Sequence, residues 1–177
     1  MISNNVEQMR KKDVGIGKVR TYNEVVEYLD ALKPYEYSEA SVLRMKELDQ
    51  ALGMPTANKD IILVGGTNGK STALRFASKL LLEEGLSVAT AYSTHILTYN
   101  ERLHLRLEAV SNKTFADLLN EVITVAEVNK IKATAHELLL ISLVLHAKNE
   151  KIDVIILASA LVSGASFISC GAAHRGL

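Results

Sequence analysis

The sequence lacks an excess of charge of either sign. Twenty lysines and arginines balance twenty aspartates and glutamates over 177 residues. Binding to nucleic acid or to an anionic membrane surface usually needs a basic excess, so the composition predicts neither partner. Paired cysteines are also lacking, because Cys170 is the only cysteine, and no disulfide can form within the chain.

Long apolar runs are missing as well. The opening segment MISNNVEQMRKKDVGIGK has no apolar core of the kind found in secretory signals. The apolar runs near residues 138–145 and 154–162 are shorter than the ~20 residues that span a bilayer. Early acidic residues and little serine argue against an organellar presequence. We therefore expect a cytoplasmic protein in a reducing compartment.

What is present is the composition of a globular domain. The chain is 48% apolar and 23% charged, so it can bury a core of its own. Apolar residues at helical spacing predict helices within TYNEVVEYLDALKP, SEASVLRMKELDQALGMP, STALRFASKLLLEEG, TFADLLNEVITVAEV and TAHELLLISLVLHA. The last of these is apolar almost all round, which indicates a buried helix.

Two helix ends carry clear signals. Thr21 stands three residues before Glu24, which is the spacing of a capping box. Gly85 follows the third helix at the position where a left-handed residue commonly ends a helix. That third helix is predicted to turn one face inward, comprising Leu74, Ala77, Leu80 and Leu81.

Four short apolar runs predict strands: DIILVGG, LSVATAY, RLHLRL and IDVIILA. The first is continuous, the pattern of a strand that is buried on both faces. The order strand, glycine loop, helix, strand implies a right-handed crossover and a parallel sheet. We therefore predict an α/β fold of the P-loop NTPase type, with a mostly parallel sheet flanked by helices. In such sheets ligands bind beyond the carboxyl ends of the strands, where GGTNGKST falls.

The glycine loop has the chemistry of a phosphate cradle. Glycines 65, 66 and 69 allow tight turns that present backbone N–H groups to an anion, and the positive end of the next helix adds to the attraction. Lys70 would reach the outer phosphates, and the hydroxyl of Ser71 or Thr72 could ligate Mg²⁺. The alternative is a glycine turn whose lysine is merely solvated.

The loop also departs from the general P-loop. That pattern needs a glycine five positions before the Gly-Lys pair, where this chain has Val64. Only the shorter form G-x-x-G-K-S is present, which disfavours an unrelated small P-loop kinase.

Several segments together resemble one family. VGGTNGKST looks like the phosphate loop of the Mur ligase superfamily, and GLSVATAYSTHILTYNERLHL is similar to the stretch that follows this loop in folylpolyglutamate and dihydrofolate synthases. TYNEVVEYLDAL and SVLRMKELDQALGMP resemble the two helices before the loop in those enzymes. TAHELLLISLVLHAKNEKIDVIIL resembles their T-x-x-E helix and the following strand. The resemblance covers about residues 21–157 and implies a Mur ligase central-domain-like fold.

This resemblance implies ATP and Mg²⁺ as cofactors. Ligases of the family phosphorylate a carboxylate of pteroate or folate, and the amine of glutamate then displaces the acyl phosphate. The implied phosphate-binding residues are Gly66, Thr67, Asn68, Gly69, Lys70, Ser71 and Thr72, with Lys70 as the main catalytic cation. Ser93, which matches the serine of T-S-P-H, is the implied metal ligand together with Ser71.

The chain departs from the family after residue 157. Ala158 stands where the family has a Mg²⁺-binding glutamate, and a methyl group offers no oxygen to a hard cation. Ser71 replaces a glycine usual in folate ligases. We therefore expect an N-terminal extension (1–20), a partial ATP-binding domain (21–157) and a divergent tail (158–177), with an exposed sheet edge that could self-associate. This chain alone is predicted to be an incomplete, inactive ligase; the alternative is a non-catalytic remnant or nucleotide-binding module.

Several other polar residues are expected to have structural roles. Glu101 and Arg102 are expected to hold the shape of the loop rather than to act on substrate. Ser93 and His95 could simply occupy a strand end, since Thr94 replaces the family's proline. Thr134 and Glu137 have capping-box spacing.

The remaining histidines carry no metal signature. His104 alternates with leucines, so an exposed strand position is expected. His136 and His146 have no cysteine, aspartate or second histidine at the spacing of a metal site.

Overall fold

A five-stranded sheet forms the centre of the structure, a computed structural model that describes residues 18–32 and 39–158. The spatial order is β1 (Asp60–Val64), β5 (Val154–Ala158), β2 (Val88–Ala91), β3 (Leu103–Leu105) and β4 (Glu108–Ala109). The first three strands run parallel, and β3 and β4 are antiparallel additions at one edge. The predicted α/β fold with parallel strands around the glycine loop is confirmed.

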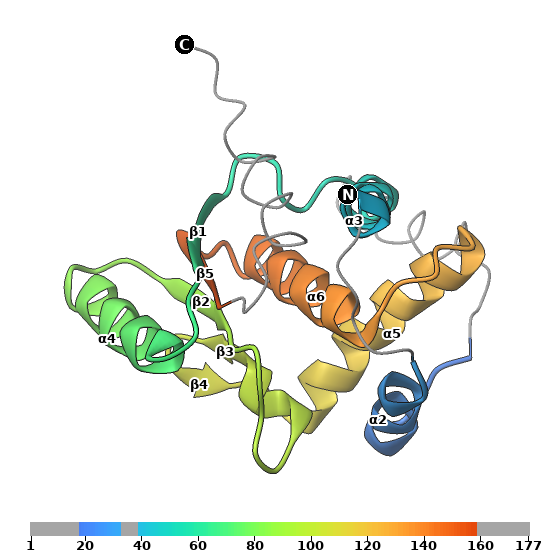
Figure 1. Cartoon of the computed structure of the whole chain (residues 1–177), viewed down its shortest axis with the longest axis horizontal. Coiled ribbons are helices and arrows are strands. Elements are labelled where there is room, and N and C mark those ends of the chain that lie inside the picture. The colour runs from blue at the N-terminus through green and yellow to red at the C-terminus, as the bar shows by residue number, and fades with distance from the viewer. Residues whose placement is uncertain (1–17, 33–38, 159–177) are drawn as a thin grey trace, which may run out of the picture.

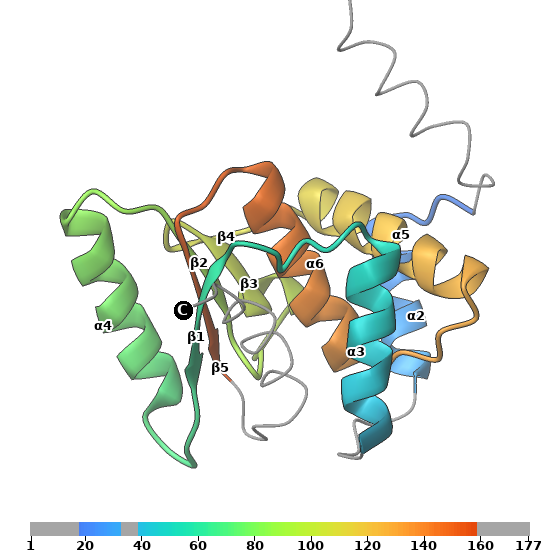
Figure 2. The same cartoon turned by 90° about the horizontal axis from the view of Figure 1, so that it is seen from above.

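Helices cover both faces of this sheet unequally. They are α2 (Tyr22–Ala31), α3 (Glu39–Ala51), α4 (Lys70–Glu83), α5 (Asn112–Val128) and α6 (Ala135–Asn149), with a short 3₁₀ helix η1 (Tyr99–Arg102) before β3. Among the described helices, only α4 lies on one face (Figure 2). On the other face α6 packs against the sheet, α5 lies beside it, and α2 and α3 form an outer layer (Figures 1 and 2).

The helix ends follow the sequence signals. The side chains of Thr21 and Thr134 each accept a hydrogen bond from a backbone N–H three residues later, and both predicted capping boxes are present. Gly85 has a φ of 84°, the left-handed conformation expected after α4. Each cap satisfies backbone groups that a helix end would otherwise leave without a partner.

The main core lies between the sheet and the α5–α6 layer. Phe115, Leu119, Ile141 and Leu143 have no exposed surface there. A separate, smaller cluster under α4 consists of four buried residues, Leu74, Val88, Ile156 and Ala158. Burial of α6 on almost every side confirms the prediction from its apolar sequence.

Two sequence expectations about burial are wrong. Strand β1 is not buried on both faces, because Ile62 is 46% exposed. Leu80, expected on the inner face of α4, is 62% exposed, whereas Leu74 is fully buried. Both follow from the position of α4, which packs over β2 and β5 rather than over β1. Strand β1 is therefore an edge strand of the sheet that the described residues form.

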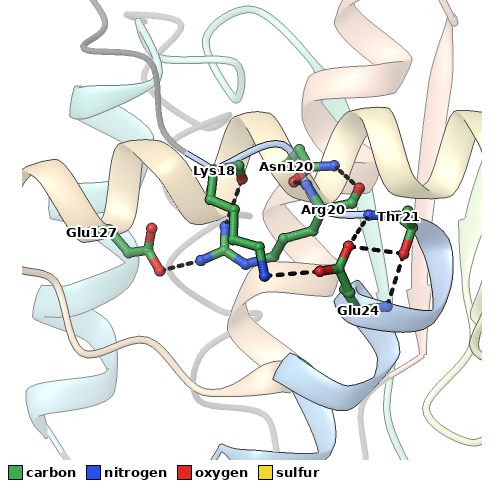
Figure 3. A network of polar contacts seen from close by, with 6 residues as sticks. All are labelled: Lys18, Arg20, Thr21, Glu24, Asn120 and Glu127. Carbon is green, nitrogen blue, oxygen red and sulfur yellow. Dashed lines mark hydrogen bonds and ion pairs between the residues drawn. The ribbon is translucent and has the colours of Figure 1, made fainter.

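A polar network attaches the first described residues to α5 (Figure 3). The amide of Asn120 accepts from the Arg20 N–H (2.8 Å) and donates to the Arg20 carbonyl (2.7 Å). The Arg20 guanidinium also pairs with Glu127 (2.6 Å) and lies over the Tyr28 ring. Lys18 pairs with Glu24, the capping-box residue of α2. These contacts fix α2 against α5.

Most of the predicted N-terminal extension and of the predicted tail lies outside the described residues, so the division into domains remains a prediction. None of the helices within 18–32 and 39–158 is long and apolar enough to cross a membrane.

Candidate functional site

Residues 65–69 connect β1 to α4 as a glycine-rich turn. Gly66 and Gly69 have φ values of 127° and 77°, which L-residues with side chains rarely adopt. A Cβ added at either position would meet nothing within 4 Å, so backbone conformation rather than space requires glycine there. Gly69 is also the N-cap of α4, and no side chain caps this helix. Its first N–H groups are therefore available to an anion.

Lys70 lies at the first position of α4 and folds over the turn. Its Nζ donates to the carbonyls of Gly66 (2.5 Å) and Thr67 (3.2 Å). The ammonium is thereby held among the residues that the sequence predicts to surround phosphates. Residues 66–69, Ser71 and Thr72 are exposed.

The carboxyl ends of the parallel strands meet at one edge of the sheet. Val64, which ends β1, pairs in register with Ala158, which ends β5 and is fully buried. Strand β2 lies on the other side of β5. With strands ~4.8 Å apart, the residues after β2 begin about 10 Å from the glycine turn. This shared end of β1, β5 and β2 is called the carboxyl edge below.

The segment 93–102 after β2 is held in shape by Glu101. Its carboxylate accepts the backbone N–H groups of residues 96, 97 and 98, each at 2.9 Å. These three bonds lower the pKa of Glu101. The Arg102 guanidinium donates from Nη2 to the Ser93 carbonyl at 2.7 Å. Both residues make the contacts that a shape-holding role predicts.

An open cavity of about 800 Å³ lies between the flank of α4 and segment 93–102. Ser71 and Thr72 border it, so it is continuous with the end of the glycine turn. Its walls combine the cations Arg75 and Lys79 with apolar side chains and two histidines. The lining residues are Ser71, Thr72, Arg75, Phe76, Lys79, Tyr92, Thr94, His95, Ile96, Glu101, His104 and Leu107.

The two predicted metal ligands, Ser71 and Ser93, differ in their position relative to this cavity. Ser71 borders this cavity, whereas Ser93 does not line it and is placed by its carbonyl contact with Arg102. Their role toward Mg²⁺ stays a prediction. Within the described ranges no group of three or more histidine, cysteine, aspartate or glutamate side chains could hold a metal ion.

Burial lowers the pKa of three histidines near this region. His104, expected to be exposed, is half-buried and packs edge-on against Tyr92 at 4.9 Å. The Tyr92 ring covers part of it, and both rings line the cavity. Burial and then the Arg75 charge lower its pKa. Burial and the Arg102 charge lower the pKa of His95 and bring that of His136 to about 4.

Sequence reasoning missed one buried ion pair. Glu137 is fully buried and caps α6, as predicted, but it also accepts two hydrogen bonds from Arg44 of α3, at 2.8 and 3.2 Å. The two residues are 93 positions apart. No local pattern signals such a contact, because it depends on how α3 packs against α6.

Comparison with curated proteins identifies partial relatives. The chain is 31% identical over 150 residues to the dihydrofolate synthase/folylpolyglutamate synthase of Haemophilus influenzae, a match that covers 82% of this chain and 26% of that protein. The Bacillus subtilis protein of the same name is 35% identical over 79 residues, or 45% of this chain and 18% of the relative. The chain thus spans between 18% and 26% of these two relatives. No protein-family model matches the chain.

Solved structures show the same relationship in the fold. The Thermotoga maritima folylpolyglutamate synthase is 27% identical with a TM-score of 0.69, over 79% of this chain and 33% of that one. A complex of folylpolyglutamate synthase with AMPPCP and folate is 24% identical with a TM-score of 0.73, over 78% of this chain and 35% of that one. The fold of the described residues is therefore that of part of these synthases.

Proposed function

We propose, for a chain related by sequence and fold to part of the dihydrofolate synthase/folylpolyglutamate synthases, that residues 66–72 bind the phosphates of MgATP. The observation that carries this proposal is the glycine turn. It joins a parallel strand to a helix whose N-terminus no side chain caps, with Lys70 folded over it. A relative solved as a complex with the ATP analogue AMPPCP and folate supports the same ligand.

Each group in the turn has a defined part. The N–H groups of residues 66–70 would donate to the β- and γ-phosphates, and the helix N-terminus adds a partial positive charge. Lys70 would exchange its two carbonyl contacts for phosphate oxygens and offset charge during transfer. The hydroxyl of Ser71 is the oxygen donor offered to Mg²⁺, which keeps several waters when protein ligands are few. Ser93 is proposed as a second ligand.

The proposed reaction class is ADP-forming amide ligation, carried out by a longer enzyme of which this chain represents a part. The γ-phosphoryl group passes to a carboxylate oxygen of folate or pteroate, which gives ADP and an acyl phosphate. The amine of glutamate then attacks the acyl carbon, an amide forms, and phosphate and a proton leave. The relative solved with folate supports this substrate class.

For residues 1–177 alone, we propose nucleotide binding without ligation. Ala158 occupies the end of β5 beside the turn and is fully buried. Its methyl group adds no oxygen at the point where the family resemblance implies a Mg²⁺-binding glutamate. ATP-dependent release of ADP that requires both folate and glutamate would contradict this proposal.

Thermal unfolding tests nucleotide binding directly. MgATP should raise the melting temperature of the protein, because a ligand stabilises the folded state that binds it. Lys70→Ala should abolish the shift. Lys46→Ala removes an exposed lysine of α3 and should leave the shift unchanged. Absence of any shift in the wild-type protein would refute the proposal.

A further inference from the structure

Arg102, the last residue of η1, is a half-buried cation whose neighbouring carboxylates are engaged elsewhere. Glu101 accepts three backbone N–H groups, and Asp30 accepts a tyrosine hydroxyl at 2.7 Å. Glu137 pairs with a different arginine at 2.8 Å. The ion pairs found within residues 18–32 and 39–158 do not include Arg102. No described carboxylate therefore pairs with this charge, which lies 5.6 Å from the centroid of the Tyr99 ring.

The guanidinium itself has unused donors. Nη2 donates to the Ser93 carbonyl, while the buried Nε finds no acceptor. Burial lowers the pKa of the group, which indicates that the surroundings do not fully replace its hydration. A buried donor and an unbalanced charge both cost free energy unless a partner arrives.

The location of Arg102 connects it to the proposed site. Its carbonyl accepts the Tyr92 N–H at 2.8 Å, directly after β2, so Arg102 lies at the carboxyl edge. The glycine turn follows β1 at the same edge, with β5 between the two strands. The length of a triphosphate chain is comparable to that two-strand separation of about 10 Å. A ligand anchored in the turn can therefore extend toward Arg102.

We propose that Arg102 is a binding residue for an oxyanion at the carboxyl edge, either a phosphate of the nucleotide or the carboxylate of the second substrate. Which ligand supplies the oxyanion rests on the proposed function. A planar guanidinium suits both, because its parallel N–H groups match two oxygens of a phosphate or carboxylate. The Nη donors that are not bonded to Ser93 would make these contacts, and the buried Nε–H would respond to them through the shared guanidinium.

The competing explanation is that Arg102 only fixes segment 93–102. Nitrogen-15 NMR separates the two, because the Nε–H resonance is sensitive to an oxyanion that binds the same guanidinium. In the full chain this resonance is assigned by its absence from the spectrum of Arg102→Lys, or by through-bond correlation experiments on the wild-type protein. Inorganic phosphate should shift it in a saturable manner. No shift in the wild-type protein would overturn the proposal.

Two variants show whether the ion binds at Arg102 itself. Lys70→Ala should retain the Nε–H shift, and loss of the shift in that variant would place the ion in the glycine turn instead. Arg102→Gln can still donate to Ser93 but lacks the charge, and should bind phosphate about tenfold more weakly. Arg106→Gln, an equal loss of charge at an exposed position, should bind as the wild type does.

Titrations with MgATP and with folate identify the source of the oxyanion. The ligand that shifts the Nε–H resonance supplies it. Unchanged affinity of Arg102→Gln for phosphate, folate and MgATP would again overturn the proposal. If phosphate shifts the resonance while MgATP leaves the melting temperature unchanged, the inference stands and the proposed nucleotide function fails.

Discussion

The two faces of the sheet are built differently. Ten of the fifteen residues of α6 are buried, whereas only Leu74 and Ser78 of the fourteen in α4 are. The α5–α6 face carries most of the apolar core, and its buried carboxylate, Glu137, is paired with Arg44. The α4 face has exposed apolar side chains, a cavity and the glycine turn. Stability is concentrated on one face, which leaves the other free to present ligand-binding groups.

The largest expected contrast is between two phenylalanines. Phe115 of α5 is fully buried and contacts the rings of Tyr22 and Tyr99, so Phe115→Ala should destabilise the fold by about 4 kcal/mol. Phe76 of α4 is 67% exposed, and Phe76→Ala should cost less than about 0.5 kcal/mol. Urea unfolding measures both. Similar losses of stability in the two variants would show that the two faces contribute equally to the free energy of unfolding.

Acid should destabilise the fold through His136 of α6. The pKa of His136 is about 4 in the folded chain, below its ordinary value of 6.5, because the ring is buried. The unfolded state binds the extra proton between these values, so stability should fall by up to about 3 kcal/mol as the pH drops from 6.5 to 4. Urea unfolding of His136→Gln should show a flatter pH dependence in that window. An unchanged profile would assign the acid sensitivity to other groups.

Glu137→Gln tests the paired carboxylate of the α5–α6 face. The variant removes the charge that Arg44 contacts, and we expect a loss of about 2 kcal/mol. Glu121→Gln changes an exposed carboxylate on α5 and is the matched control, with an effect near zero. Equal melting temperatures for the two variants would show that the buried pair adds nothing.

The smallest expected effect concerns the glycine turn. Gly69→Ala places a side chain at a φ of 77° and should cost about 1 kcal/mol of stability. Gly65 is not among the glycines with positive φ, so Gly65→Ala should cost less. Differential scanning calorimetry of both variants measures the contrast. The reverse order would mean that space rather than backbone conformation limits this turn.

Local sequence signals predicted much of this structure. The capping boxes of α2 and α6, the left-handed Gly85 and the strand–glycine turn–helix unit were all visible within a few residues of chain. Such features depend on hydrogen bonds and φ values within one turn of the backbone. They can therefore be predicted without knowledge of tertiary packing.

Features that depend on packing between elements were not predictable in this way. The exposure of Leu80 follows from where α4 sits on the sheet, and the half-burial of His104 from its packing against the Tyr92 ring. The partnership of Arg44 with Glu137 joins two helices far apart in sequence. The short strand β4 and the helix η1 were also missed, since two to four residues carry no periodic pattern.

The attachment of Arg20 to α5 makes the fold sensitive to a slow chemical change in one side chain. One side-chain amide, that of Asn120, supplies both the donor and the acceptor that a neighbouring peptide group would offer. Deamidation of Asn120 would replace the donating nitrogen by a carboxylate oxygen 2.7 Å from the Arg20 carbonyl, and attraction would become repulsion. Loss of a single ammonia molecule would thus loosen α2, with no change in the glycine turn at the other side of the sheet.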